Sequence, residues 1–357
     1  MSIPVSQAIR VVKYIIEQKR RGNRYFPLVL MLEPLFRCNL TCAGCGKVNY
    51  PDEILQKRLT PEQCFKAVDE CGAPIVSIPG GEPLLHNEID RIVEGLIARK
   101  KYIYLCTNGQ ILKQKLYLFR PSKYLTFSVH LDGLAEEHDR IVGRQGAFDT
   151  AVEAIRQALQ MGFRVATNTT LYADADVERT RLFFDYMTAL GVESMMISPG
   201  YNFSNSLNKD NFLNRYRAIE LFRNILSESK RTWKFNQSPL FLDFLMGLRH
   251  YDCSPWCMPA YNIFGWQKPC YLIDEGHVSS FRELIEGTDW KQYGVSSGNI
   301  KCQDCMVHSG YEGTAVIDTF SSWAALIRAG RILLFGIGNE KLKSKKHREI
   351  KYEGKAK

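Results

Sequence analysis

Three cysteines in the segment CNLTCAGC are the first candidates for chemistry. Cys38, Cys42 and Cys45 follow an apolar run and have the spacing C-x3-C-x2-C. Three thiolates cannot complete a tetrahedral metal site, whereas a [4Fe–4S] cluster held by three thiolates leaves one iron open to a small ligand. A zinc site, or a cluster completed by a distant cysteine, fits the spacing equally well.

A second motif, PGGEPLLH, spans residues 79–86 and follows the cysteines by one strand-and-helix unit. Gly80 and Gly81 allow a close backbone approach, and Glu82 before Pro83 places a carboxylate acceptor at the end of a strand. A glycine pair alone is typical of an ordinary turn. In combination with the three cysteines, it favours a catalytic cofactor site.

Short apolar runs alternate with helical stretches as far as residue 200. Strands are expected at 27–36, 73–80, 101–109, 124–133, 163–171 and 191–200. Helices are expected between them, for example at 60–72, capped by Thr60, and at 87–100, capped by Asn87. Six such repeats predict an α/β barrel with parallel strands, in which reacting groups lie at the C-terminal strand ends.

Two of these strands indicate which side chains face the interior of the barrel. In LTFSVHLD the polar residues alternate with apolar ones, so Thr126, Ser128, His130 and Asp132 are expected to point inward. By the same parity Tyr102, Tyr104, Cys106 and Asn108 face inward on the preceding strand. For His130 and Asp132 a positioning role is expected, because an inward histidine is commonly a hydrogen-bonded core residue.

The two motifs and the alternating elements together resemble the radical S-adenosylmethionine (SAM) superfamily, whose members share a (βα)6 partial TIM barrel. The resemblance implies a [4Fe–4S] cluster on Cys38, Cys42 and Cys45, and SAM bound by Gly80, Gly81 and Glu82. It further implies contacts to the SAM ribose or carboxylate from Asn108, Ser128 and Arg140. An electron donor such as flavodoxin or ferredoxin is implied as a partner.

Longer stretches, among them FPLVLMLEPLFRCNLTCAGCGK, FSVHLDGLAEEHDR and NIFGWQKPCYL, resemble the adenosylhopane synthases of hopanoid biosynthesis, over residues 1 to about 325. That resemblance implies addition of a 5′-deoxyadenosyl radical to the terminal alkene of the lipid diploptene, giving adenosylhopane. The alternative is another radical SAM enzyme, for instance a peptide-modifying one with an auxiliary cluster. A non-catalytic iron–sulfur or zinc protein is a further alternative.

Cys106 is the residue expected to complete such an addition. Radical addition leaves a tertiary carbon radical that needs one hydrogen atom, and an S–H bond is weaker than a tertiary C–H bond. Because Cys106 is predicted to point inward at a strand end, we expect it to be the hydrogen-atom donor. A buried structural cysteine is the alternative, and Tyr102 and Tyr104 are alternative donors.

Five further cysteines lie in the C-terminal third, at positions 253, 257, 270, 302 and 305. They resemble the cysteine-bearing extension that holds an auxiliary iron–sulfur cluster in some radical enzymes, and a structural zinc is equally compatible. The related family commonly has another cysteine where this chain has Ser309. The expected ligands, if a second metal or cluster is bound, are Cys253, Cys270, Cys302 and Cys305.

The 357-residue chain has a net charge of +9, with much of the excess Lys and Arg at its two ends, which does not favour a nucleic-acid binder. The N-terminus lacks a secretory signal pattern, which predicts a cytoplasmic protein with reduced thiols. Four parts are expected: a basic amphipathic helix at 1–22, the barrel at 23–205, a cysteine-containing extension at 206–320 that closes it, and an apolar segment with a basic tail at 321–357. Peripheral contact with the inner face of the cytoplasmic membrane is expected of the tail, and packing on the barrel or membrane contact of the first helix.

Overall fold

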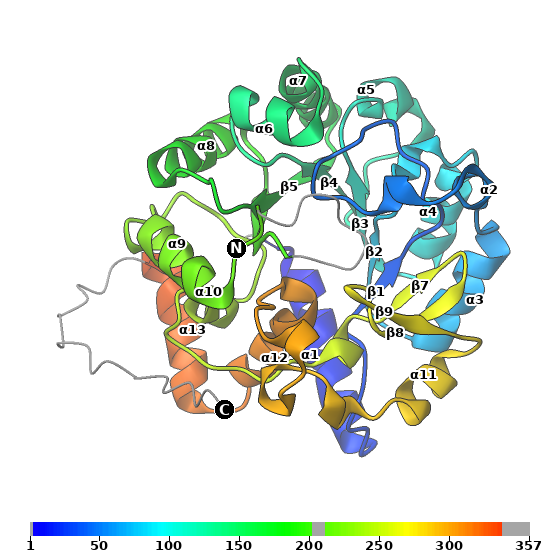
Figure 1. Cartoon of the computed structure of the whole chain (residues 1–357), viewed down its shortest axis with the longest axis vertical. Helices are drawn as coiled ribbons and strands as arrows, with labels where there is room; N and C mark the ends of the chain where they lie inside the picture. Colours follow the sequence, from blue (N-terminus) through cyan, green and yellow to red (C-terminus); the bar gives the residue numbers. More distant parts are fainter. Residues whose placement is uncertain (1–2, 202–210, 338–357) are drawn as a thin grey trace, which may run out of the picture.

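The computed structural model describes residues 3–201 and 211–337. Nine strands form one sheet in the order β6-β5-β4-β3-β2-β1-β7-β8-β9. The first six strands are parallel, and helices pack around their outer face (Figure 1). The six are β1 (Val29–Leu32), β2 (Ile75–Ile78), β3 (Tyr102–Thr107), β4 (Leu125–His130), β5 (Arg164–Leu171) and β6 (Ser194–Pro199).

Each of the six strands lies within the range expected from the sequence, so the partial barrel is confirmed. The outer helices are α2 (Asp52–Leu55), α3 (Pro61–Cys71), α4 (Ile89–Ala98), α5 (Leu112–Lys115), α6 (Ala135–Val142), α7 (Ala147–Gln160) and α8 (Val177–Leu190). Thr60 caps α3 as predicted, because Gln63 N donates to its hydroxyl and Thr60 N donates to the Gln63 side chain.

The predicted Asn87 cap is wrong. Helix α4 begins at Ile89, and Asn87 accepts a hydrogen bond from Arg58 Nη1 instead. His86 supplies the local acceptor, since Glu88 N donates to its Nδ1 at 3.1 Å. Glu88 is the N-cap residue of α4, and no side chain among the described residues caps its first turn.

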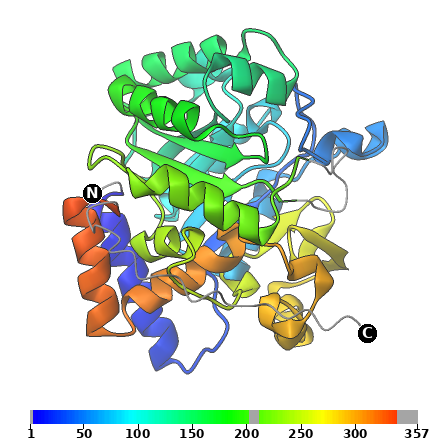
Figure 2. The same ribbon diagram turned by 60° about the vertical axis from the view of Figure 1, so that its left-hand side comes forward.

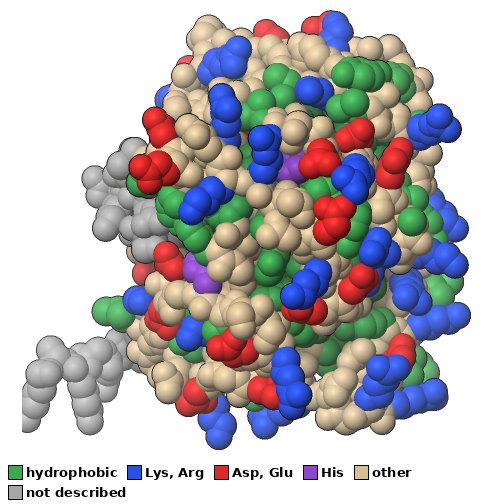
Figure 3. All heavy atoms as spheres, turned by 90° about the vertical axis from the view of Figure 1, so that its right-hand side faces the viewer, with side chains coloured by type: hydrophobic (Ala, Val, Ile, Leu, Met, Phe, Trp, Pro, Cys, Tyr) green, Lys and Arg blue, Asp and Glu red, His purple; other side chains and the backbone are tan. Residues whose placement is uncertain are grey.

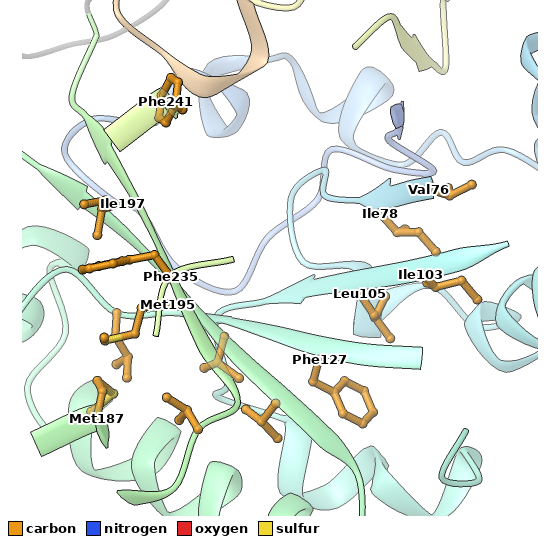
Figure 4. Packing of buried hydrophobic residues seen from close by; sticks show 14 of the residues in the cluster. Val76, Ile78, Ile103, Leu105, Phe127, Met187, Met195, Ile197, Phe235 and Phe241 are labelled. Atoms are coloured by element: carbon orange, nitrogen blue, oxygen red, sulfur yellow. The ribbon is translucent and has the colours of Figure 1, made fainter. Parts of the chain in front are cut away.

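The predicted strand parity is confirmed by the packing of the apolar residues. Ile103, Leu105 and Phe127 are fully buried on the outer face of the sheet, against the covering helices (Figure 4). Val76 and Ile78 on β2 continue the same layer. The residues that alternate with these on β3 and β4 therefore face the interior of the barrel. Among them, Cys106 of β3 is paired with Ser128 of β4.

Helix α1 (Val5–Arg20) packs on the barrel, as one of its two expected placements requires. Gln7 is buried, and its Nε2 donates to the Tyr104 hydroxyl at 3.1 Å. Ile15 packs against Phe26 and Leu28. Tyr104, an alternative hydrogen donor from the sequence, is thus hydrogen-bonded to α1.

The C-terminal part continues the barrel sheet rather than only covering it. Strand β7 (Ala260–Asn262) pairs in parallel with β1, and β8 (Gly265–Cys270) and β9 (Ile273–Val278) follow as antiparallel neighbours. The sequence pattern did not predict these three strands. The helices of this part are α9 (Arg215–Ser227), α10 (Pro239–Leu245), α11 (Phe281–Gly287), α12 (His308–Thr319) and α13 (Trp323–Phe335).

The four predicted parts stay predictions, and the basic tail beyond residue 337 lies outside the described residues. Within the described part, no helix is both long enough and apolar enough to span a bilayer.

Candidate active site

The three-cysteine loop leaves β1 and lies over the C-terminal end of the barrel. Ala43 N donates to Ile141 O at 3.0 Å, which ties the loop to α6. All three cysteines are partly buried. Burial, together with the neighbouring Glu82 and Cys45, raises the pKa of the Cys38 thiol to about 11. Burial and the charges of Cys45, Asp132 and Cys38 raise the pKa of Cys42 well above its usual range.

The electrostatics of this loop fit an iron–sulfur cluster. The three thiols lie within electrostatic reach of one another, and their mutual repulsion in the charged state is what bound iron would offset. Among the described residues, no group of three or more His, Cys, Asp or Glu surrounds a single metal ion. The thiolates of a [4Fe–4S] cluster bind different irons, so they need not converge on one ion.

The glycine turn after β2 is bonded to the segment that carries the first cysteine. Gly81 N donates to Leu35 O at 3.0 Å, and Glu82 N donates to Arg37 O at 2.8 Å. A Cβ on Gly81 would lie 2.1 Å from Arg37 O, so no larger residue fits there. Gly80 has a φ of 128°, and a Cβ there would lie 2.4 Å from Leu35 O. The two sequence motifs therefore form one backbone unit.

Glu82 is completely buried beneath this turn. One carboxylate oxygen accepts from Leu84 N at 3.1 Å, and the other accepts from Asn108 N at 2.8 Å. Burial raises the Glu82 pKa to about 7, against the lowering effect of these hydrogen bonds. Glu82 thus joins the ends of β2 and β3, and its contact with SAM stays a prediction.

Asn108 lies between Glu82 and the cysteine loop. Its Nδ2 donates to Asn39 Oδ1 at 2.7 Å and lies 3.6 Å from Cys38 Sγ. Ser128 is buried beside Cys106. Arg140 is about half exposed and forms an ion pair with Asp174 at 2.7 Å, in a small hollow beside Asp132. Asn108 is therefore adjacent to the cluster loop, whereas Arg140 lines a different hollow from Cys106.

Cys106 lines a cavity of about 960 Å³, part of it open to solvent, inside the barrel. Its Sγ lies 3.4 Å from Ser77 Oγ, and burial raises its pKa to about 11, so the residue is a neutral thiol at physiological pH. Gly80 of the glycine turn lines the same cavity. The predicted inward position of Cys106 is confirmed, and its role as a hydrogen donor stays a prediction.

His130 and Asp132 form a pair at the end of β4, with His130 Nε2 2.7 Å from Asp132 Oδ2. Burial opposes the charged imidazole, but the Asp132 carboxylate raises the His130 pKa overall. The other Asp132 oxygen accepts from Thr170 N at 2.7 Å. This bonding fits the positioning role expected from the sequence.

Two charged residues that line the cavity around Cys106, called the central cavity below, were not identified from the sequence. Lys47 Nζ lies 2.9 Å from Glu33 Oε2 and 4.1 Å from the centre of the Phe36 ring. Both charged residues line the cavity that contains Cys106. Lys47 stands two positions after Cys45, and Glu33 directly follows β1, so both lie beside segments that the sequence already indicated. They were not singled out because no motif includes them.

A second group of cysteines lies in the C-terminal part. The four predicted ligands line one cavity together with Ser309, and they are Cys253, Cys270, Cys302 and Cys305. Burial raises the pKa of Cys305 to about 12, with Cys270 and Cys302 adding to the effect. A Cβ on Gly310 would lie 2.6 Å from Cys253 Sγ, so a small residue is required behind that thiol.

Cys257, the fifth cysteine of this part and not one of the expected ligands, lies elsewhere. It is buried against Phe26 and Leu28 beside α1. The fold thus selects the same four cysteines that the sequence analysis favoured, and their chemistry fits a metal or a cluster with four thiolate ligands. Whether they bind one stays a prediction.

The cavity that contains Cys106 and the four-cysteine cavity meet at the turn between β8 and β9. Leu272 lines both cavities. Tyr271 lines the central cavity, and its pKa is raised by burial, then by Cys305 and Cys270. The hydroxyl of Ser309 hydrogen-bonds Tyr271, which places this serine at the boundary between the sites.

Comparison with known proteins indicates which family the barrel resembles. A model described as the Radical SAM superfamily matches residues 32–184. Over these residues the chain is similar to the radical SAM superfamily. A second model, described as a domain of unknown function (DUF3463), matches residues 195–329. The radical SAM superfamily uses a [4Fe–4S] cluster and SAM, and the three-cysteine loop with its glycine turn fits both.

Relatives of the radical SAM domain have several different activities. A GTP 3′,8-cyclase of Aquifex aeolicus is 30% identical over 202 residues, which cover 52% of this chain and 63% of that protein. The mycofactocin maturase MftC of Mycolicibacterium smegmatis is 27% identical over 48% of this chain and 44% of its own length. The superfamily is confirmed, and the narrower likeness to adenosylhopane synthases stays a prediction.

Solved structures confirm the fold. SuiB of Streptococcus suis, bound to S-adenosylmethionine, superposes with a TM-score of 0.57 at 17% identity, over 71% of this chain and 62% of SuiB. The enzyme anSMEcpe with bound AdoMet gives a TM-score of 0.58 at 14% identity, over 85% of this chain and 99% of its own. At these identities the likeness concerns the partial barrel and not the substrate.

Proposed function

We propose that this chain is a radical SAM enzyme that acts on a substrate held in the central cavity. One observation carries the proposal: the cysteine loop and the glycine turn are joined by backbone hydrogen bonds directly above a cavity lined by Cys106. In this proposal Cys38, Cys42 and Cys45 hold the cluster. Gly80, Gly81 and Glu82 form the SAM-binding turn, with Asn108, Ser128 and Arg140 as further contacts.

When bound and reduced, the cluster and SAM supply methionine and a 5′-deoxyadenosyl radical, and the protein directs the radical. The chain's own residues fix the geometry. Glu82 locks the ends of β2 and β3, and Asn108 holds the loop through Asn39.

The comparisons support one class of reaction more than the other, namely modification by a radical SAM enzyme with an auxiliary cluster. SuiB and anSMEcpe share the fold, and the four-cysteine cavity adjoins the central one at Leu272. A cluster on Cys253, Cys270, Cys302 and Cys305 would accept the electron that an oxidised substrate radical releases. A peptide is the substrate suggested by analogy with SuiB, solved with the precursor peptide SuiA, and with anSMEcpe, solved with the Cp18Cys peptide.

A second reaction, addition to the alkene of diploptene, is favoured by Cys106. The adenosyl carbon would bond to the terminal alkene carbon, and the Cys106 S–H would give its hydrogen atom to the resulting tertiary radical. The thiyl left behind would regain one electron and one proton, the electron coming from a donor such as reduced flavodoxin or ferredoxin. Most of the surface of the cavity around this thiol is apolar, which suits a hydrocarbon.

One anaerobic assay separates the two reactions. Reconstituted protein, reductant and SAM are incubated with diploptene, and the products are analysed by mass spectrometry. An adduct of adenosyl plus diploptene would establish the addition. Release of 5′-deoxyadenosine without an adduct would retain the radical SAM activity and leave the oxidative reaction, whereas no cleavage of SAM would overturn the proposal as a whole.

A further inference from the structure

Helix α13 presents an apolar face to solvent. Six large side chains on it are between 41% and 81% exposed, and they are Trp323, Leu326, Ile327, Leu333, Leu334 and Phe335. The helix lies at the periphery of the molecule (Figures 1 and 2). Its sequence, WAALIRAGRILLF, contains two arginines and no acidic residue. We name the six side chains the α13 apolar face.

This face is held rigidly in place by the opposite side of the helix. Ala325, Ala329 and Ile332 are buried, and Arg328 forms two hydrogen bonds of 2.9 Å with the buried carboxylate of Asp243 on α10. The Ser322 hydroxyl caps the first turn. The exposure therefore belongs to a docked helix whose other side is already packed, and a group of large exposed apolar side chains on such a helix indicates a further partner.

A different face of the molecule shows what an ordinary surface of this protein looks like. On the side that includes α3 and α4, Lys and Arg are interspersed with Asp and Glu (Figure 3). Arg91 pairs there with Glu62 and Glu88, and Arg99 pairs with Asp69. The α13 apolar face has no such pattern.

The chain that follows α13 indicates the charge of the partner. Residues 339–357 contain eight Lys or Arg and three Glu. The large apolar residues among them are Leu342, Ile350 and Tyr352, too few to cover the six side chains of the face. A second copy of the chain would bring two basic segments together, and their repulsion opposes a symmetric contact.

We infer that α13 docks on the surface of an anionic phospholipid bilayer. The apolar face enters the headgroup region, with Trp323 at the boundary that indole rings favour, and the excess of Lys and Arg in the sequence after α13 favours lipids with anionic headgroups. The inference concerns attachment and does not depend on which reaction the central cavity supports.

Co-sedimentation of the full chain with lipid vesicles tests the inference. Vesicles of phosphatidylcholine, with and without phosphatidylglycerol, are compared for the wild type and for two matched variants. Leu334→Glu lies on the α13 apolar face, and Leu182→Glu is its control on α8, since the two leucines are 59% and 57% exposed. Both variants change the net charge equally.

Binding to the anionic vesicles is expected to fall about tenfold in Leu334→Glu and to stay near the wild-type level in Leu182→Glu. Salt should weaken wild-type binding, because the basic segment contributes to it. Equal loss in the two variants, or no binding of the wild type, would overturn the inference. So would a concentration-dependent dimer, measured by analytical ultracentrifugation, that Leu334→Glu abolishes.

A fluorescence measurement covers the case in which Leu334→Glu does not fold. Vesicles that contain brominated phosphatidylcholine should quench the tryptophan emission of the wild type and quench Trp323→Phe less. Equal quenching in the two proteins would contradict insertion of α13.

Discussion

The two cysteine sites differ in what holds them. The three-cysteine loop is fastened by backbone hydrogen bonds to the glycine turn and to α6, all at the ends of barrel strands. The four-cysteine site collects residues from loops, from the end of β8 and from the turn before α12. The first site has one ligand fewer, and it opens toward the cavity that contains Cys106.

This difference separates two tasks. A site with three thiolates leaves a position for SAM, and it needs a rigid scaffold because the radical must be aimed. A site with four thiolates can satisfy all four irons of a cluster, so it can store an electron or fasten the chain without binding a substrate. The comparison therefore predicts that the sites respond differently to the loss of one thiol.

The largest effect is expected for Cys42→Ala. Loss of this ligand should reduce SAM cleavage to background. SAM needs the fourth, open iron of a cluster whose other three irons are each held by a thiolate. Iron content should fall by about half if both sites bind clusters. Chromatography of 5′-deoxyadenosine and an iron assay give the two values. Cys64→Ala, at a buried position on α3, is the control.

A smaller effect on cleavage is expected for Cys302→Ala. Iron content should again fall by about half, but SAM cleavage without a substrate should continue, since the first site is intact. Electron paramagnetic resonance of the reduced protein should show one cluster signal instead of two. If Cys302→Ala stopped SAM cleavage while the protein stayed folded, the separation of tasks would fail.

Cys106→Ala is expected to spare both sites and change only the product. Cleavage of SAM should continue. Without the thiol hydrogen donor, however, the saturated adduct with diploptene should be lost or formed as a mixture of stereoisomers. Mass spectrometry and NMR of the product measure this. An unchanged yield and stereochemistry would show that Cys106 is a structural residue.

The smallest effect is expected from Glu312, which holds α12 to α10 through a 2.6 Å hydrogen bond from Ser238 N. Burial raises its pKa to about 8, so the folded protein keeps a proton that the unfolded chain releases near pH 4.5. Folded-state stability around α12 should therefore fall as the pH rises from about 4.5 to 8, by on the order of 2–4 kcal/mol.

Hydrogen exchange of the α12 amides at pH 6 and pH 8, corrected for the intrinsic rate, measures this loss. Glu312→Gln keeps an acceptor for Ser238 N and should remove the pH dependence. Glu220→Gln, at an exposed position on α9, should leave it unchanged.

The barrel was predictable from the sequence and the C-terminal part was not, for a physical reason. Strands of the barrel repeat with their helices. The alternation in LTFSVHLD predicted that Ser128 faces inward, and the same parity on the preceding strand predicted this for Cys106; the two residues are paired in the structure. Strand β9, with the sequence IDEGHV, has no apolar alternation because it lies at the edge of the sheet. The packing of Cys257 against Phe26 and Leu28 beside α1 is a contact between distant parts of the chain, which no local pattern shows.

Pairing of β7 with β1 has a consequence for the order in which the chain folds. Met31 N donates to Pro259 O and Glu33 N donates to Tyr261 O. One edge of β1 therefore lacks these hydrogen-bond partners until residues 259–261 have been synthesised. Until these emerge from the ribosome, the strand that leads into the cysteine loop has an unsatisfied edge, and such edges recruit other chains. Nascent chains that end before residue 259 should therefore aggregate, and the cluster loop should gain its final support only after most of the protein has been synthesised.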